Sequence, residues 1–396
     1  MARKIILNYA IFMLLEGLVI SFFFGTYTLF LLEKGLSLLE VNLLNCSFMV
    51  AVFLFEIPTG VIADFFGRKR SVVIGLFVYS SSFLIYFLSD NLWQFLLAEI
   101  IAAAAFTCIS GALEALVVDS LKHYDYEGDF EPVFKKAEIR QLGVLIGAII
   151  GSFAGQVDLS LPWLLSSLGF ILLAIFSIFF LREDYFKKSL KSTVNFLALR
   201  KIARDGIAYG PKNHRIMFGA LFSATLAFVV QPLNMYWQVI FNGYFGLEVK
   251  FMGFIFSGIV ILTFVGSQLS GFWQKIIRCK KEAMISSQLI TLFGIIGCLL
   301  FLNLPVFLTF FLIHEVGRGL FRPLIRAYIN KNIDNKNRAT VLSLESMITK
   351  AGAGLGLVFS GLIANSFGPL ASWLVSAIVL ALAIFLFWRE GRKEKY

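Results

Sequence analysis

Several ionisable side chains lie inside long apolar stretches of this sequence, where a charge is costly unless it faces protein or water. A carboxyl group in such surroundings can titrate near neutral pH, so these residues are suited to carrying protons. For Glu16, hydrogen bonding to Asn8, Tyr9 or a neighbouring helix is the alternative interpretation. The candidate proton-coupling residues are Glu16, Glu56, Glu99, Glu114, His314 and Glu315.

Four of the ionisable residues near position 318 share one helix face, because spacings of three and four residues bring side chains together on a helix. The group contains His314, Glu315, Arg318 and Arg322. It could bind an anionic substrate or relay protons. Alternatively, its members form static ion pairs with Glu345 or with acids of the N-terminal half.

A stripe of uncharged polar groups follows the same spacing around Pro232, which we expect to break the helix locally and free a carbonyl group. We interpret this stripe as cavity lining rather than helix packing. Together with nearby bases and aromatic residues, the candidate substrate-cavity residues are Gln231, Asn234, Tyr236, Trp237, Gln238, Arg318, Arg322 and Lys350.

The composition indicates which elements must position these residues. Of the 396 residues, 58% are hydrophobic and only 15% are charged, whereas soluble domains are about 45–50% apolar and about 25% charged. A bilayer span needs roughly 20 apolar residues, and the sequence predicts twelve transmembrane helices in an all-α membrane protein. In the first half they cover 6–32, 39–63, 71–89, 92–119, 138–157 and 162–181. In the second half they cover 215–241, 249–273, 283–302, 305–328, 339–364 and 369–388.

The basic residues outside these segments predict the orientation of the chain. Apart from Arg318, Arg322 and Lys350 within the spans, every Lys and Arg except Lys34 and Lys250 falls on the side that carries both termini. Cytoplasmic loops carry the excess of Lys and Arg, so both termini are predicted to be cytoplasmic. The net charge of +10 is then a topology signal that requires no nucleic-acid partner.

The two halves resemble each other, which indicates a duplication. The segment 111–116 is similar to 319–324, 208 residues later, and a basic loop at 60–70 recurs at 271–281, 211 residues later. Many transporters are built from such repeats. We therefore predict two pseudo-symmetric six-helix bundles, 1–181 and 215–396, joined by a cytoplasmic loop at 182–214. The repeat also pairs Glu114 with Arg322, and we suggest that they form a bridge between the halves.

The segment from Gly60 to Arg70 resembles a signature of the major facilitator superfamily, G-x-x-x-D-x-x-G-R-[KR]-[KR], and the predicted topology matches that family along the whole chain. The resemblance implies a secondary transporter that works by alternating access, with this loop acting as a latch. A glycine permits a tight turn, and an arginine can pair with acids on a neighbouring helix. The implied gating residues are Gly60, Asp64, Gly67, Arg68, Lys69 and Arg70.

Two departures weaken the similarity to proton-driven drug exporters of this family. Their fourth helix carries a buried arginine, whereas the buried charges here are Glu99 and Glu114. Their fifth helix ends its glycine-rich motif in Gly-Pro, and the segment 138–157 has the glycines without the proline.

The favoured function is proton-coupled export of amphipathic or drug-like molecules. The alternatives are proton-coupled import of a small polar metabolite or organic anion, and a membrane receptor or assembly subunit that does not transport. An enzyme is not expected, because the sequence has no nucleotide-binding glycine loop, no metal-ligand spacing and no soluble catalytic domain. We expect a monomer in a bacterial cytoplasmic membrane, with a small-molecule substrate and protons as partners and no cofactor or metal.

Overall fold

The computed structural model describes residues 1–185, 213–333 and 338–393, and every regular element within these ranges is helical. Among them, eleven helices are long and apolar enough to cross a bilayer. This confirms the predicted all-helical membrane class. The structure does not test the domain boundaries at 181 and 215, since most of the predicted loop between them lies outside the described residues.

The chain forms two compact units, residues 1–194 with 241–257 (unit 1) and residues 195–240 with 258–396 (unit 2). The helices of unit 1 are α1 (Ala2–Ile20), α2 (Tyr27–Glu33), α3 (Leu38–Phe66), α4 (Arg68–Leu88), α5 (Leu92–His123), α6 (Glu131–Lys136), α7 (Arg140–Val157) and α8 (Leu161–Phe180). In unit 2 they are α10 (His214–Val239), most of α11 (Met252–Ile276), α12 (Lys280–Leu300), α13 (Leu304–Lys331), α14 (Arg338–Phe367) and α15 (Pro369–Lys393). A π-helical turn (Ile240–Tyr244) follows α10.

The first predicted span, 6–32, is not one helix. The structure breaks it at residues 21–26, between α1 and α2. Within this break the Ser21 hydroxyl donates to the Leu18 carbonyl, and the Thr26 hydroxyl donates to the Phe23 carbonyl. Bonds of the same kind lie inside unbroken helices, for example from Thr107 to the Ala103 carbonyl in α5, so they accompany the break and do not explain it.

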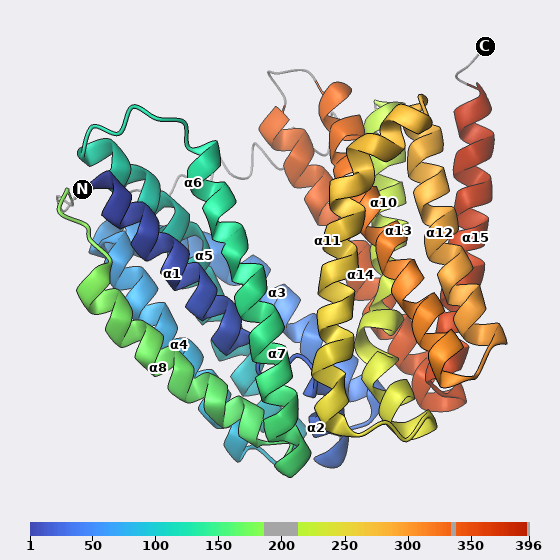
Figure 1. The fold of residues 1–396 in the computed structure, drawn as a ribbon, viewed down its shortest axis with the longest axis horizontal. Coiled ribbons are helices and arrows are strands. Elements are labelled where there is room, and N and C mark those ends of the chain that lie inside the picture. The colour runs from blue at the N-terminus through green and yellow to red at the C-terminus, as the bar shows by residue number, and fades with distance from the viewer. Residues whose placement is uncertain (186–212, 334–337, 394–396) are drawn as a thin grey trace. The chain divides into compact units, whose positions relative to one another are not determined.

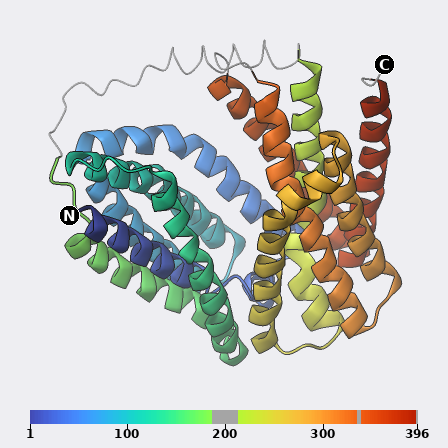
Figure 2. The same cartoon turned by 45° about the horizontal axis from the view of Figure 1, so that its top comes forward.

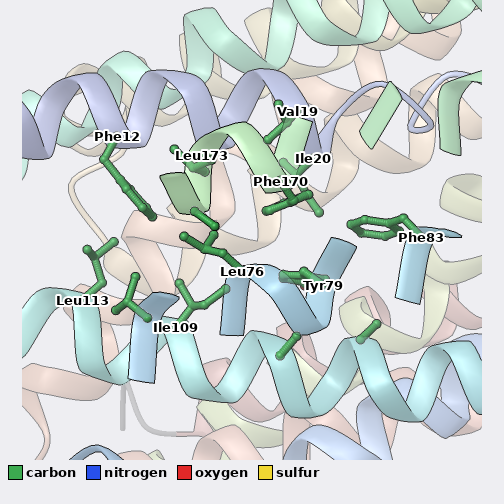
Figure 3. Packing of buried hydrophobic residues seen from close by; sticks show 14 of the residues in the cluster. Phe12, Val19, Ile20, Leu76, Tyr79, Phe83, Ile109, Leu113, Phe170 and Leu173 are labelled. Carbon is green, nitrogen blue, oxygen red and sulfur yellow. The ribbon is translucent and has the colours of Figure 1, made fainter. Parts of the chain in front are cut away.

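The core of unit 1 is a layer of aromatic and branched side chains contributed by α1, α4, α5 and α8. Figure 3 shows Phe12 and Ile20 of α1 facing Leu76 of α4 and Phe170 of α8, with Leu113 of α5 on the other side. These five residues are buried. Apolar packing therefore stabilises the helices that carry the charged residues, by about 25 cal/mol for each Å² of apolar surface buried.

Glycines bring α7 against α1 more closely than any other residue would allow. A Cβ atom at Gly143 or Gly147 would collide with the backbone carbonyl of Leu14 or Leu18. Figure 2 shows the result, with α1 in dark blue running beside α7 and α8. Small residues at a helix interface permit this approach.

Unit 2 repeats this contact. Gly352 and Gly356 of α14 would meet the backbone of Ala224 and Phe228 of α10 if they carried a Cβ. Each of the two glycines follows its counterpart on α7 by 209 residues, close to the spacing of the sequence repeat. The close packing of α7 on α1 in unit 1 therefore recurs as the packing of α14 on α10 in unit 2 (Figure 1). This recurrence supports the predicted duplication.

Pro232 does not break its helix, contrary to the prediction. α10 runs through it from His214 to Val239. The Pro232 carbonyl accepts a hydrogen bond of 3.0 Å from Trp373 of α15. This bond ties α10 to α15, whereas the carbonyl that a proline deprives of its helical donor is that of Phe228, four residues earlier.

Candidate functional site

The charged residues within the spans fall into two classes by burial and partners. One class is buried or half-buried and hydrogen-bonded inside its own unit: Glu16, Glu99, His314, Glu315 and Arg318. The other class is exposed on its own unit and has no ion pair with a described residue: Glu56, Glu114, Arg322 and Lys350. A charge exposed on an apolar span faces water or protein rather than lipid, so the second class indicates polar faces.

The buried carboxyl group of Glu99 is held by hydroxyl groups. Its Oε1 accepts hydrogen bonds from Tyr86 of α4 and, at 3.2 Å, from Tyr27 at the start of α2. Asn45 of α3 donates to the Tyr27 hydroxyl at 3.0 Å. The Glu99 residue is only 7% exposed, and no Lys, Arg or His of the described chain pairs with it.

Stacked aromatic rings fix this site in place. Trp163 of α8 stacks on Tyr86 with ring centroids 4.0 Å apart, and on Phe23 at 4.2 Å. Stacked aromatic pairs contribute about 0.5–1.5 kcal/mol beyond their buried area. The stacking on Trp163 therefore holds the Tyr86 ring in place independently of its hydrogen bond to Glu99.

Glu16, by contrast, forms an ion pair with Arg140, the first residue of α7. The guanidinium donates through Nε and, at 3.2 Å, through Nη2 to the two carboxylate oxygens. Arg140 lies within the predicted segment 138–157 and within the candidate span Glu131–Val157. Of the two interpretations of Glu16, the structure displays the contact with a neighbouring helix. The proton-carrying role stays a prediction.

Glu315 in unit 2 also has a cationic partner. Arg318 donates to Glu315 Oε1 at 2.7 Å, and Thr263 of α11 donates to Oε2 at 3.0 Å. His314 Nε2 lies 3.2 Å from Glu315 Oε1 without an aligned hydrogen bond, while its Nδ1 bonds to the Phe311 carbonyl. The side chain of Glu315 is 2% exposed and that of Arg318 is 20% exposed.

The predicted substrate-cavity residues of α10 divide in the structure. Gln231 and Asn234 are half-buried, whereas Tyr236, Trp237 and Gln238 are buried within unit 2. The ring of Trp237 lies beside that of Phe311 of α13, with centroids 6.4 Å apart. A role for the stripe in binding substrate stays a prediction.

The predicted gating loop contains a turn at its glycine and an ion pair between its arginine and an acid of a neighbouring helix, as its residues implied. Gly67, between α3 and α4, has a φ of +99°, a conformation that only glycine adopts readily. Arg68 pairs with Asp119 of α5, donates to the Ala115 carbonyl at 2.9 Å and lies 3.9 Å from Asp64. Gly60 and Arg70 are exposed, and Lys69 donates to the Ile178 carbonyl at 2.7 Å. The gating role itself stays a prediction.

Sequence analysis missed the partners of these residues. Tyr27 and Tyr86 escaped a search for charged side chains, although a tyrosine within an apolar span is a usable signal. Asp119 and Arg140 lie at or near the ends of the predicted segments 92–119 and 138–157 and were not among the candidate residues. Glu183, which accepts hydrogen bonds from the Arg68 and Lys69 amides at 2.6 and 3.0 Å, follows the last helix of the first half and had no motif.

Eleven long apolar helices that carry buried ion pairs and a repeated helix–helix contact define a multi-pass membrane protein. The Major Facilitator Superfamily profile matches residues 9–242 and 216–396. The chain belongs to this superfamily, as its signature loop predicted.

Individual relatives match most of the chain. It is 24% identical over 385 residues to the uncharacterized MFS-type transporter YxaM of Bacillus subtilis (strain 168), covering 95% of this chain and 93% of that protein. It is 23% identical over 342 residues to Multidrug resistance protein 2 of the same organism, covering 84% and 82%. The crystal structure of the nucleoside transporter NupG superimposes with a TM-score of 0.79 at 15% identity, covering 97% of this chain and 98% of that one. That likeness concerns the fold alone.

Proposed function

We propose that this protein is a proton-coupled exporter of amphipathic or drug-like small molecules that works by alternating access. It would do so as a monomer with twelve spans in two six-helix bundles, in a bacterial cytoplasmic membrane with both termini inside. The superfamily supports transport, and the similarity to a protein named for multidrug resistance supports export. The observation that carries proton coupling is the environment of Glu99.

Glu99 differs from the other buried carboxyl groups because its partners tolerate both protonation states. A tyrosine hydroxyl can donate a hydrogen bond to a carboxylate or accept one from a carboxylic acid, whereas an arginine can only donate. Arg140 at Glu16 and Arg318 at Glu315 can only donate hydrogen bonds. Tyr27 and Tyr86 can satisfy Glu99 with or without a proton.

The break before α2 supplies a means of opening this site. Tyr27 is the first residue of α2 and follows the non-helical residues 21–26. A small movement of α2 would withdraw the Tyr27 hydroxyl and admit water to Glu99. Burial of a charge costs several kcal/mol without compensation, so proton uptake would accompany closure and proton release would accompany opening.

The test is transport in liposomes that contain a pH-sensitive dye, under an imposed proton gradient. Cationic and neutral drugs, sugars and organic anions are offered to the wild type, Glu99→Gln, Glu16→Gln and the exposed control Glu138→Gln. We expect drug-dependent proton movement that is abolished in Glu99→Gln and retained in the control. Proton movement that persists in Glu99→Gln but is lost in Glu16→Gln would show that Glu16, the partner of Arg140, binds the proton instead of Glu99.

A second candidate function is import of an organic anion, which Arg322 and Lys350 favour. Both are exposed on unit 2 without an ion pair to a described residue, and bases of this kind bind carboxylates or phosphates. Proton movement that occurs only with organic anions and is lost in Arg322→Gln would replace the exporter by this importer. If none of the compounds caused proton movement, the result would instead favour a receptor or assembly subunit.

A further inference from the structure

A cavity of about 670 Å³ lies where the start of α4 meets the end of α8 in unit 1. Its apolar wall includes Phe66, Ile74 and Phe179, which are exposed, the last to 74%. Its rim carries the basic residues Lys69 and Arg70. The cavity is thus apolar along the helices and basic at their ends.

The acidic residues at this cavity are already occupied by the protein. The Glu183 carboxylate accepts the Arg68 and Lys69 amides and caps the first turn of α4, where a helix dipole favours an anion. Asp184 accepts the Tyr124 hydroxyl at 2.6 Å. Neither acid pairs with a basic side chain of the cavity among the ion pairs of the described residues.

The basic residues, by contrast, have hydrogen-bonding capacity left. Arg70 is exposed and has no side-chain hydrogen bond or ion pair with a described residue. Arg182 lies beside the Tyr124 hydroxyl, and a guanidinium has five N–H donors. Lys69 uses one of its three donors on the Ile178 carbonyl.

We propose that this cavity binds the headgroup of an anionic phospholipid, with Arg70 and Arg182 on the phosphate and an acyl chain along Phe66, Ile74 and Phe179. Both helices end here, so the basic rim lies at the membrane interface, where the headgroups are. Basic pockets between spans on the cytoplasmic side bind such headgroups, and the orientation predicted from the basic loops puts this rim on that side. Free phosphate would make no use of the apolar wall, which is why the lipid is the occupant.

The test is native mass spectrometry of the full chain in detergent with phosphatidylglycerol or phosphatidylcholine of identical acyl chains. The wild type is expected to retain phosphatidylglycerol preferentially. Each basic residue near an anionic membrane surface contributes about a five-fold change in affinity, so Arg70→Gln with Arg182→Gln should weaken phosphatidylglycerol binding by about 25-fold. Lys136→Gln, which removes an exposed base of α6 in the same unit, should change it less than two-fold.

Two further measurements separate a lipid site from a site for any anion. Phe179→Ala should lower phosphatidylglycerol retention several-fold, whereas Phe272→Ala, which removes a similarly exposed ring of α11, should not. Inorganic phosphate at millimolar concentration should fail to displace the lipid. Equal retention of both lipids by the wild type, unchanged binding in the double variant, or displacement by phosphate would each overturn the proposal.

Discussion

Replacing Arg318 by Gln should destabilise the protein more than replacing Glu315 by Gln, because the two partners are unequally buried. The Glu315 side chain is 2% exposed and the Arg318 side chain 20%. Without Arg318 the carboxylate stays buried, with only Thr263 and His314 near it. Removing one member of a buried ion pair costs about 3–5 kcal/mol. In Glu315→Gln the guanidinium that is left can reach water, and the cost falls to about 1–3 kcal/mol.

Thermal unfolding in detergent, followed by tryptophan fluorescence at pH 7, measures this difference. For a domain of this size about 1 kcal/mol shifts Tm by about 2–4 °C, so we expect a loss of roughly 10 °C in Arg318→Gln and roughly 5 °C in Glu315→Gln. The double variant should lose less than the sum, because neither charge is then left alone. Arg326→Gln, an exposed base on the same helix, is the control and should leave Tm unchanged.

Two results would refute this reasoning. Equal Tm shifts in the two single variants would show that the burial of the remaining partner does not determine the loss of stability. Strict additivity in the double variant would show that the ion pair contributes nothing to stability. If Arg318→Gln left Tm intact and abolished transport of an organic anion, the residue would belong to a substrate site rather than to a structural pair.

Three further predictions concern other parts of the molecule. Gly147→Leu should prevent folding, because the new Cβ atom would collide with the α1 backbone. The loss of folding would be seen as loss of a monodisperse peak in size-exclusion chromatography. The control Gly111→Leu should be tolerated, because the space around Gly111 is open. If Glu114 and Arg322 form the suggested bridge, the double charge-neutral variant should transport better than the product of the single effects predicts, and purely additive effects would exclude the bridge. Hydrogen bonds from the Ser160 hydroxyl and amide hold the pKa of Asp158 below its usual range. Its stabilisation is present above about pH 4 and is lost as the pH falls through the lowered pKa. Asp158→Asn should therefore lower Tm slightly at pH 7 and by progressively less below pH 4, and a difference that does not shrink as the pH falls would contradict this.

The spans could be predicted from the sequence because a bilayer imposes a long apolar run on every helix that crosses it. The predicted segment 92–119 corresponds to α5, Leu92–His123, and 369–388 to α15, Pro369–Lys393. The break at 21–26 escaped the same reasoning, since its residues are as apolar as a helix interior. The hydropathy of these residues therefore gives no sign of where α1 ends.

The candidate site was predicted only in part, because a sequence shows which residues are charged and not which helices become neighbours. Glu16 and its partner Arg140 are 124 positions apart, and Glu99 lies 72 positions from Tyr27. Within one helix the spacing rule did succeed. Arg318 pairs with Glu315 three residues before it.

The break in the first span separates two kinds of contact within unit 1. Before it, α1 carries Glu16 and packs closely against α7 through glycines, so the ion pair with Arg140 lies in a closely packed interface. After it, α2 carries Tyr27, whose contact with Glu99 is a single hydrogen bond between neutral and acidic groups. Movement at the break would leave the first contact intact and interrupt the second. For this reason Glu99, which has no arginine partner, is a stronger candidate than Glu16 for the carboxyl group that binds and releases a proton.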